Sequence, residues 1–212
     1  MSTFDHFEPL IRQHTFHTMG ADLAHDAAHI SRVVKSAKTL AIKESANLDI
    51  VMPAAYLHDL FSYGKDHPLN HQSSLLSADN AIAFLTSIEY PNELLSAIHH
   101  AIHAHSYSAN IAPTTLEAKI VQDADRLDAL GAIGIARTIQ VSSHLNRPLY
   151  QLDDPFANHR ALDDSQFCLD HFYTKLLNLV ALFHTTGAKQ EAQLRTDFMS
   201  AYLRQLGHEI ES

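Results

Sequence analysis

The sequence predicts an all-α protein, and three features of composition and patterning support this fold class. Only 6 glycines and 7 prolines occur among 212 residues, while alanine and leucine are plentiful. Apolar residues recur along most of the chain at the i, i+3, i+4, i+7 spacing of one helix face. No segment shows a strong alternation of apolar and polar residues, which a half-buried strand requires. We therefore expect a bundle of helices.

Five helices are predicted in the first half of the chain. Their ranges are 4–19, 26–44, 47–60, 71–87 and 91–105. Gly20 ends the first helix, and the carboxylate of Asp26 caps the free amides at the start of the second. Pro53 falls in the first turns of the third helix, where a missing amide costs least. Residues 62–70 form a loop because they are rich in Gly, Pro, Asp and Asn.

Three helices are predicted in the second half. Thr114 and Glu117 have the spacing of a capping box, which starts a long helix that runs to Gln140. The polar segment 142–165 is the best candidate for a long functional or lid-like loop. Two final helices cover residues 170–184 and 189–206. An exposed apolar stripe on the last helix would support a homodimer.

Length and cysteine usage favour one domain in a reducing compartment. A chain of 212 residues is long enough for one sizeable core. The single cysteine, Cys168, excludes an internal disulfide framework and a multi-cysteine zinc site. The first residues lack a secretory signal, and no stretch is long and apolar enough to cross a bilayer. We expect a cytoplasmic protein without a membrane partner.

The charge of the chain limits its partners. A formal net charge of −9 argues against binding a nucleic acid polymer by neutralising its phosphates. A small anionic substrate is still compatible with this charge, because a divalent cation and a few Lys or Arg side chains can reverse the potential inside one cleft. The 17 histidines are an excess, but most of them suit a solvated surface.

His58 and Asp59 stand side by side at the end of an apolar helical stretch. Burying this pair without a cation would cost several kcal/mol per charge, roughly, unless the pair were fully hydrogen-bonded. A bland alternative has Asp59 capping the next turn and His58 bonding a backbone carbonyl. The pair is therefore a candidate for metal binding that needs partners from elsewhere in the chain.

Three further carboxylates crowd into two helical turns at Asp123, Asp125 and Asp128. Asp125 and Asp128 share a helix face, whereas Asp123 points elsewhere. Such close like charges are unfavourable unless a cation neutralises them. Arg126 and Arg137 are available for one or two of the carboxylates, and a metal ion would neutralise the remainder.

The ordered set His29, His58-Asp59 and Asp125 resembles the HD-domain superfamily of metal-dependent phosphohydrolases. The resemblance covers nearly the whole chain and is closest to a bacterial subgroup of small single-domain HD proteins. Three stretches carry it: His25-Asp26 with His29, Arg32 and Val33; residues 122–131; and Lys175-Leu176-Leu177 with Thr185 and Arg195. The resemblance implies an HD-domain helical bundle that spans residues 1–212 as one domain.

The resemblance also implies a ligand set for one divalent metal ion. The ligands are His29, His58, Asp59 and Asp125, with Asp123 as the rival for the last place. Two imidazoles and two carboxylates suit Mn²⁺ or Mg²⁺ first, with Co²⁺, Fe²⁺, Ni²⁺ and Zn²⁺ as alternatives. A second ion on His99 and His103 is a further alternative, since some HD enzymes are binuclear.

Catalytic and substrate-binding roles follow from the same resemblance. Asp59 or a nearby histidine would take a proton from the attacking water, and His105 would hydrogen-bond the phosphate or the leaving oxygen. The candidates for substrate binding are Arg32, Lys175, His99 and Asp128. Arg32 and Lys175 could equally be solvated side chains on helix surfaces.

The implied activity is hydrolysis of a small phosphorylated substrate, with a nucleotide preferred. Release of pyrophosphate from a nucleoside triphosphate is the first choice. Phosphomonoester hydrolysis is second, and cleavage of a cyclic nucleotide is third. A binding module that senses nucleotides, or a helical scaffold with incidental histidines, is the non-enzymatic alternative.

Overall fold

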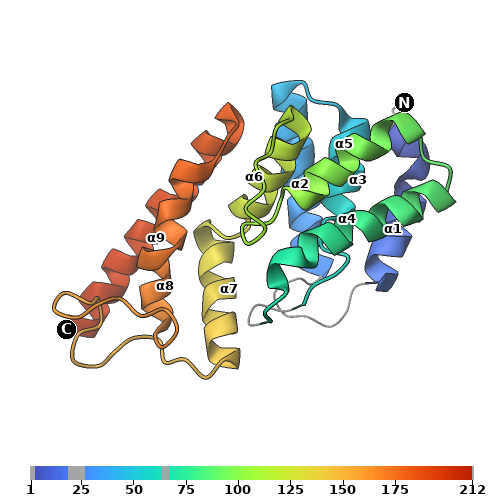
Figure 1. Ribbon diagram of the computed structural model, residues 1–212. Helices are drawn as coiled ribbons and strands as arrows, with labels where there is room; N and C mark the ends of the chain where they lie inside the picture. Colours follow the sequence, from blue (N-terminus) through green and yellow to red (C-terminus); the bar gives the residue numbers. More distant parts are fainter. Residues whose placement is uncertain (1–2, 19–26, 64–66, 212) are drawn as a thin grey trace. The chain divides into compact units, whose positions relative to one another are not determined.

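The structure, a computed structural model, describes residues 3–18, 27–63 and 67–211 (Figure 1). Within these ranges every regular element is a helix and no strand occurs, which confirms the predicted all-α class. None of these helices combines the length and apolar character needed to cross a membrane. The chain forms two compact units, Met1–Asp125 and Arg126–Ser212. The prediction of one domain over residues 1–212 stays a prediction.

The first unit is built from helices whose order follows the prediction. They are α1 (Thr3–Thr18), α2 (Ala27–Glu44), α3 (Leu48–Leu57), the short 3-10 helix η1 (Asn70–Gln72), α4 (Ser73–Ser87), α5 (Asn92–His103) and most of α6 (Leu116–Leu127). The predicted helix stop at Gly20 and the predicted cap at Asp26 lie outside the described residues.

Helix α3 lies at the centre of the first unit. Its residues from Ile50 to Leu57 are all buried, and it packs against α1, α2 and α5. A helix that is apolar on every side belongs in a core. Asn47 caps its start, with Oδ1 accepting from the Asp49 amide at 2.9 Å. Because His58 directly follows this buried helix, its side chain is carried into the interior.

The start of α6 differs from the predicted capping box. The Thr115 hydroxyl accepts from the backbone amide three residues later at 3.1 Å. The Thr114 amide donates instead to Nε2 of His100 at 3.0 Å, and the Glu117 carboxylate accepts from the Asn47 amide at 3.2 Å. The predicted capping box between Thr114 and Glu117 is wrong, because each of these residues instead hydrogen-bonds to a group from another part of the chain.

The long helix predicted up to Gln140 is also wrong, because the chain breaks it into α6 and α7 (Gly131–His144). Gly131 adopts a φ of +72°, which favours glycine and terminates a helix. Two turn-type hydrogen bonds close the end of α6, from the Ala129 amide to the Arg126 carbonyl and from the Leu130 amide to the Leu127 carbonyl, each at 3.1 Å. Asp125 therefore lies in the last turn of a helix and not in the middle of one.

The second unit contains α7, α8 (Cys168–Thr174), the 3-10 helix η2 (Leu176–Leu182) and α9 (Thr186–Glu211). The predicted helix 170–184 is thus split at Lys175, and the last helix is longer than predicted. The polar segment forms a long loop, although α7 takes its first residues. Contacts tie the loop to α8: Arg160 forms a two-pronged ion pair with Asp170 at 2.5 and 2.8 Å.

Candidate metal centre

Five polar side chains converge inside the first unit. His29 comes from the first turn of α2, His58 and Asp59 follow α3, His105 follows α5, and Asp125 lies in the last turn of α6. His29, His58 and His105 are 1%, 0% and 5% exposed. Two groups of possible metal ligands occur among the described residues: His29 with His58 and Asp125, and His58 with Asp59 and His105.

The carboxylate oxygens lie close to the imidazole nitrogens. Oδ2 of Asp59 lies 3.6 Å from Nε2 of His29 and 3.4 Å from Nε2 of His58. Oδ1 of Asp125 lies 3.5 Å and 3.9 Å from the same two nitrogens. Ligand atoms bound about 2.1 Å from one octahedral cation lie about 3.0 Å apart when adjacent and about 4.2 Å apart when opposite. These four His–carboxylate spacings fall within this range. The ligand groups nevertheless place His29, His58 and Asp125 together and put Asp59 in the group with His58 and His105, so a single ion held by all four side chains stays a prediction.

His58 has the chemical state that a metal ligand needs. Its Nδ1 lies 2.9 Å from the Ala55 carbonyl oxygen, a contact that assigns the ring proton to Nδ1 and leaves the lone pair on Nε2. Within the described part of the chain, Nε2 is buried and makes no hydrogen bond. Burial lowers the pKa of His58 to about 4, with the charge of Asp59 opposing this shift. The ring is therefore neutral, and its unprotonated Nε2, the atom that could bind a metal, faces the two carboxylates.

The alternative without a metal, in which His58 merely bonds a backbone carbonyl, therefore accounts for only one of its two ring nitrogens. His58 does bond a backbone carbonyl, as that alternative required, but it does so through Nδ1. An orphaned polar atom in a protein interior costs about 1–3 kcal/mol. A cation bound at Nε2 would remove this cost.

His105, the predicted catalytic histidine after the fifth helix, contacts one of the candidate metal ligands. Its Nδ1 lies 2.6 Å from the Ile102 carbonyl oxygen, and its Nε2 lies 3.4 Å from Oδ1 of Asp59. Burial alone would lower its pKa, but the hydrogen bond to Asp59 and the charges of Asp59 and Asp125 outweigh burial and raise the pKa. The structure adds this contact to Asp59, and the predicted contact of His105 to the phosphate or the leaving oxygen stays a prediction.

Asp125 and Asp123, the rivals for the fourth ligand place, differ in their positions on α6. The side chain of Asp125 is 29% exposed and faces both imidazoles. Asp123 is fully buried, and the ligand groups found among the described residues do not include it. The arrangement of the side chains therefore agrees with Asp125 as the fourth ligand.

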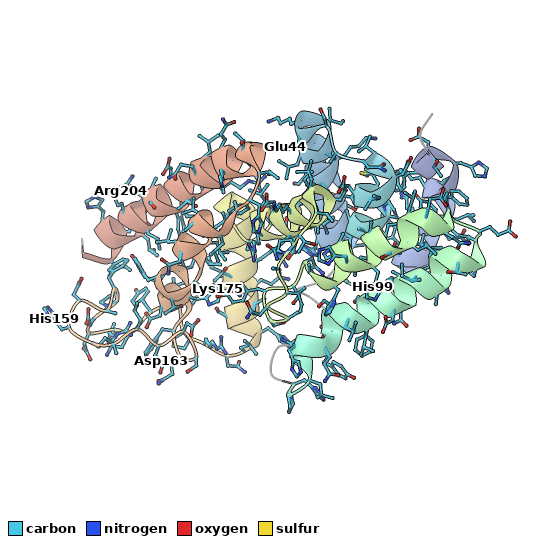
Figure 2. All side chains as sticks on the ribbon, turned by 45° about the horizontal axis from the view of Figure 1, so that its top comes forward. Glu44, His99, His159, Asp163, Lys175 and Arg204 are labelled. Atoms are coloured by element: carbon cyan, nitrogen blue, oxygen red, sulfur yellow. The ribbon has the colours of Figure 1, made fainter. Side chains whose placement is uncertain are left out.

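The remaining predicted residues of the first unit lie outside the ligand groups. Arg32 sits on α2 one turn after His29, so both side chains project from the same side of that helix. His99, labelled on α5 in Figure 2, has Nε2 2.9 Å from Oδ1 of Asp79 on α4. Asp79 provides a carboxylate beside the histidines proposed for a second ion, but the ligand groups of the described residues include neither His99 nor His103.

Two predicted residues belong to the second unit. Lys175, labelled in Figure 2, marks the junction of α8 and η2. Asp128 is 3% exposed and its Oδ2 accepts from Nη1 of Arg137 at 2.6 Å. Arg137 is thus the neutralising partner expected for one of the clustered carboxylates, and the contact gives Asp128 a structural role. Roles of Lys175 and Asp128 in substrate binding stay predictions.

Comparison with known proteins establishes the family. Residues 26–130 match the HD domain family. This chain belongs to it. The uncharacterized protein YpgQ of Bacillus subtilis (strain 168) is 33% identical over 186 residues, which cover 88% of this chain and 84% of YpgQ. The predicted membership of the HD-domain superfamily of metal-dependent phosphohydrolases is confirmed.

Solved HD-domain structures resemble the chain over its whole length. Bacillus subtilis YpgQ in complex with ADP matches with a TM-score of 0.75 and 32% identity, covering 99% of this chain and 100% of YpgQ. An HD-superfamily hydrolase from Bacillus thuringiensis matches with a TM-score of 0.77 and 32% identity, covering 100% of both chains. The likeness therefore extends beyond the residues that match the family itself.

Proposed function

We propose that this HD-domain protein is a metal-dependent hydrolase of nucleotides that releases pyrophosphate from a nucleoside triphosphate. The observation that carries the proposal is the buried, unsatisfied Nε2 of His58 facing the carboxylates of Asp59 and Asp125. The complex of the relative YpgQ with ADP supports a nucleotide as the substrate class. The choice of pyrophosphate as the leaving group rests on the resemblance of the sequence.

His29, His58, Asp59 and Asp125 would hold one ion, with Mn²⁺ or Mg²⁺ as the proposed metal. Their mixture of two imidazoles and two carboxylates suits a borderline to hard divalent cation. When bound, such a cation lowers the pKa of a coordinated water and offsets charge on phosphoryl oxygens.

The contacts of Asp59 indicate how the site would orient its own groups. One carboxylate oxygen faces His29 and His58 at 3.6 and 3.4 Å. The other oxygen faces Nε2 of His105 at 3.4 Å. Both ring nitrogens of His105 face oxygen acceptors and its pKa is raised, so His105 would fix the rotation of this carboxylate as a hydrogen-bond donor. Asp59 is then placed to accept the proton that the attacking water loses.

Arg32 and Lys175 are the proposed cationic contacts to phosphate. The guanidinium of Arg32 extends from the same helix as His29, and a planar guanidinium can hold two phosphate oxygens at once. The part assigned to Lys175 rests on the resemblance of its sequence context.

The decisive experiment incubates the purified protein with Mn²⁺ and a series of nucleoside and deoxynucleoside triphosphates, and measures phosphate and pyrophosphate separately. We expect one pyrophosphate and one nucleoside monophosphate per turnover, and no product from the His58→Leu variant. Release of phosphate alone would favour the phosphomonoesterase alternative. Absence of turnover with every phosphate compound would favour a nucleotide-binding module.

A further inference from the structure

The second unit contains a cavity of about 490 Å³ that the proposed reaction does not use. Its apolar walls come from four different segments: Phe156 of the polar loop, Tyr173 of α8, Leu177 of η2 and Leu203 of α9. The volume lies within the roughly 300–1,000 Å³ of typical small-molecule sites. None of the five residues of the metal centre lines it.

A glycine inside α9 forms part of the cavity wall. Gly207 lies about one turn before the end of the 26-residue helix Thr186–Glu211, at a helical position where glycine is less favourable than alanine. A Cβ atom built on Gly207 would lie 3.4 and 3.5 Å from Cζ and Cε2 of the Phe156 ring. The ring thus lies directly over bare helix backbone. The missing side chain leaves open a space that a larger residue would fill.

Two basic side chains occur on the same helix at the cavity. Arg204 and His208 are separated by one helical turn, line the cavity and are exposed; Arg204 is labelled on α9 in Figure 2. Within the described part of the chain, no ion pair involves either of them. No Asp or Glu is among the lining residues. In a chain with a net charge of −9, this local excess of basic groups favours an anion.

We propose that this cavity binds a small aromatic anion, at a site separate from the metal centre. The aromatic ring of the ligand would pack against Phe156 and Tyr173, because offset and edge-to-face contacts between rings are favourable. Its phosphate or carboxylate would pair with the guanidinium of Arg204, which matches the planar geometry of either group. His208 would supply a further hydrogen bond.

Two fluorescent probes with the same ring system test the shape and the charge of this site separately. 8-Anilino-1-naphthalenesulfonate carries an anion, and N-phenyl-1-naphthylamine lacks it. Arg204→Ala should weaken binding of the anionic probe about tenfold, the loss typical of one charge-assisted hydrogen bond, and leave the neutral probe unchanged. Lys189→Ala, an exposed cation of the same helix, is the matched control and should affect neither probe.

Substitutions at Gly207 test the space itself. Gly207→Leu should abolish saturable binding of both probes, because its side chain occupies the cavity beside Phe156. Gly207→Ala should raise the thermal midpoint of unfolding, since alanine is the better helix former, and this establishes that the helix accepts a side chain at this position. Binding of both probes with unchanged affinity to the Gly207→Leu and Arg204→Ala variants would overturn the proposal.

Competition identifies the source of the anion. The cavity signal is the fluorescence of the wild-type protein with probe minus that of Gly207→Leu with probe. Adenosine monophosphate and salicylate are each titrated against this difference, so that binding of the nucleotide at the metal centre does not contribute to the signal. Displacement by the nucleotide identifies a phosphate ligand, and displacement by salicylate identifies an aromatic acid. Failure of both compounds to displace the probe at millimolar concentration would contradict the proposal.

Discussion

Replacing His58 by leucine separates the cost of an unliganded metal centre from the gain that a bound ion supplies. In wild-type protein treated with a chelator, the buried Nε2 of His58 makes no hydrogen bond within the described part of the chain. Such an orphaned atom destabilises the fold by about 1–3 kcal/mol. Leucine removes this cost but also removes the hydrogen bond from Nδ1 to the Ala55 carbonyl, which contributes about 0.5–1.5 kcal/mol. The chelated variant should therefore lie between about 0.5 kcal/mol less stable and about 2.5 kcal/mol more stable than chelated wild type.

Adding Mn²⁺ should shift this balance towards wild type. An ion at 100 times its dissociation constant stabilises the folded state by about 2.7 kcal/mol. For a protein of this size, that gain corresponds to a rise of about 5–11 °C in the thermal midpoint. Wild type should show this rise, and His58→Leu should lose most of it because one of four ligands is missing.

The assay records thermal unfolding by circular dichroism in chelator and in a series of Mn²⁺ concentrations. His71→Leu serves as the control, because His71 is an exposed histidine on η1 and should leave the metal-dependent rise intact. An unchanged midpoint of wild-type protein in Mn²⁺ would refute the metal centre. An equal rise in wild type and His58→Leu would refute the role of His58 in it.

Four other substitutions probe the ligand choice, the packing after the helix break and the phosphate contact. Asp125→Ala should abolish metal content and hydrolysis while the helical signal persists, and Asp123→Ala should be milder; the reverse order in metal analysis would mean that the fourth ligand is misassigned. Gly134→Ala should destabilise the protein by roughly 1–3 kcal/mol in urea unfolding, the typical cost of overpacking, because its Cβ would clash with the backbone carbonyl of Ala129. Wild-type stability would contradict this packing. Arg32→Ala should raise KM about tenfold or more, the loss of one charged hydrogen bond, at unchanged metal content; an unchanged KM would place its guanidinium outside the substrate site.

Most helices were predictable because their faces differ in polarity. The apolar stripe of α2 and the continuous apolar run of α3 follow directly from residue spacing, and both helices occur where they were predicted. The division of the long helix at Gly131 was not predicted. A single glycine within a helical pattern is compatible with either continuation or termination, and the side chain of Arg195, packed 3.1 Å from where a Cβ would lie on Gly131, comes from a distant part of the chain.

In the candidate site, too, the sequence predicted some features and missed others. His29, His58, Asp59 and Asp125 were recognised by type and order along the chain, and these side chains do converge. The contact of His105 with Asp59 was not foreseen, since 46 positions in the numbering separate the two residues and no periodic pattern spans that interval. The pairing of His99 with Asp79 was likewise missed, because it depends on how α4 packs against α5.

The sequence itself determined the all-α class, the order of the helices and three candidate metal ligands, with Asp125 and Asp123 as rivals for the fourth place. Periodicity and residue chemistry are local properties, so they can be read without knowing the fold. Tertiary structure alone decided which nitrogen of His58 faces the carboxylates, that Asp125 and not Asp123 joins them, and that His105 contacts Asp59. These outcomes depend on packing between segments far apart in the chain. The buried helix α3 brings His58 and Asp59 to the place where α2 and α6 supply their partners.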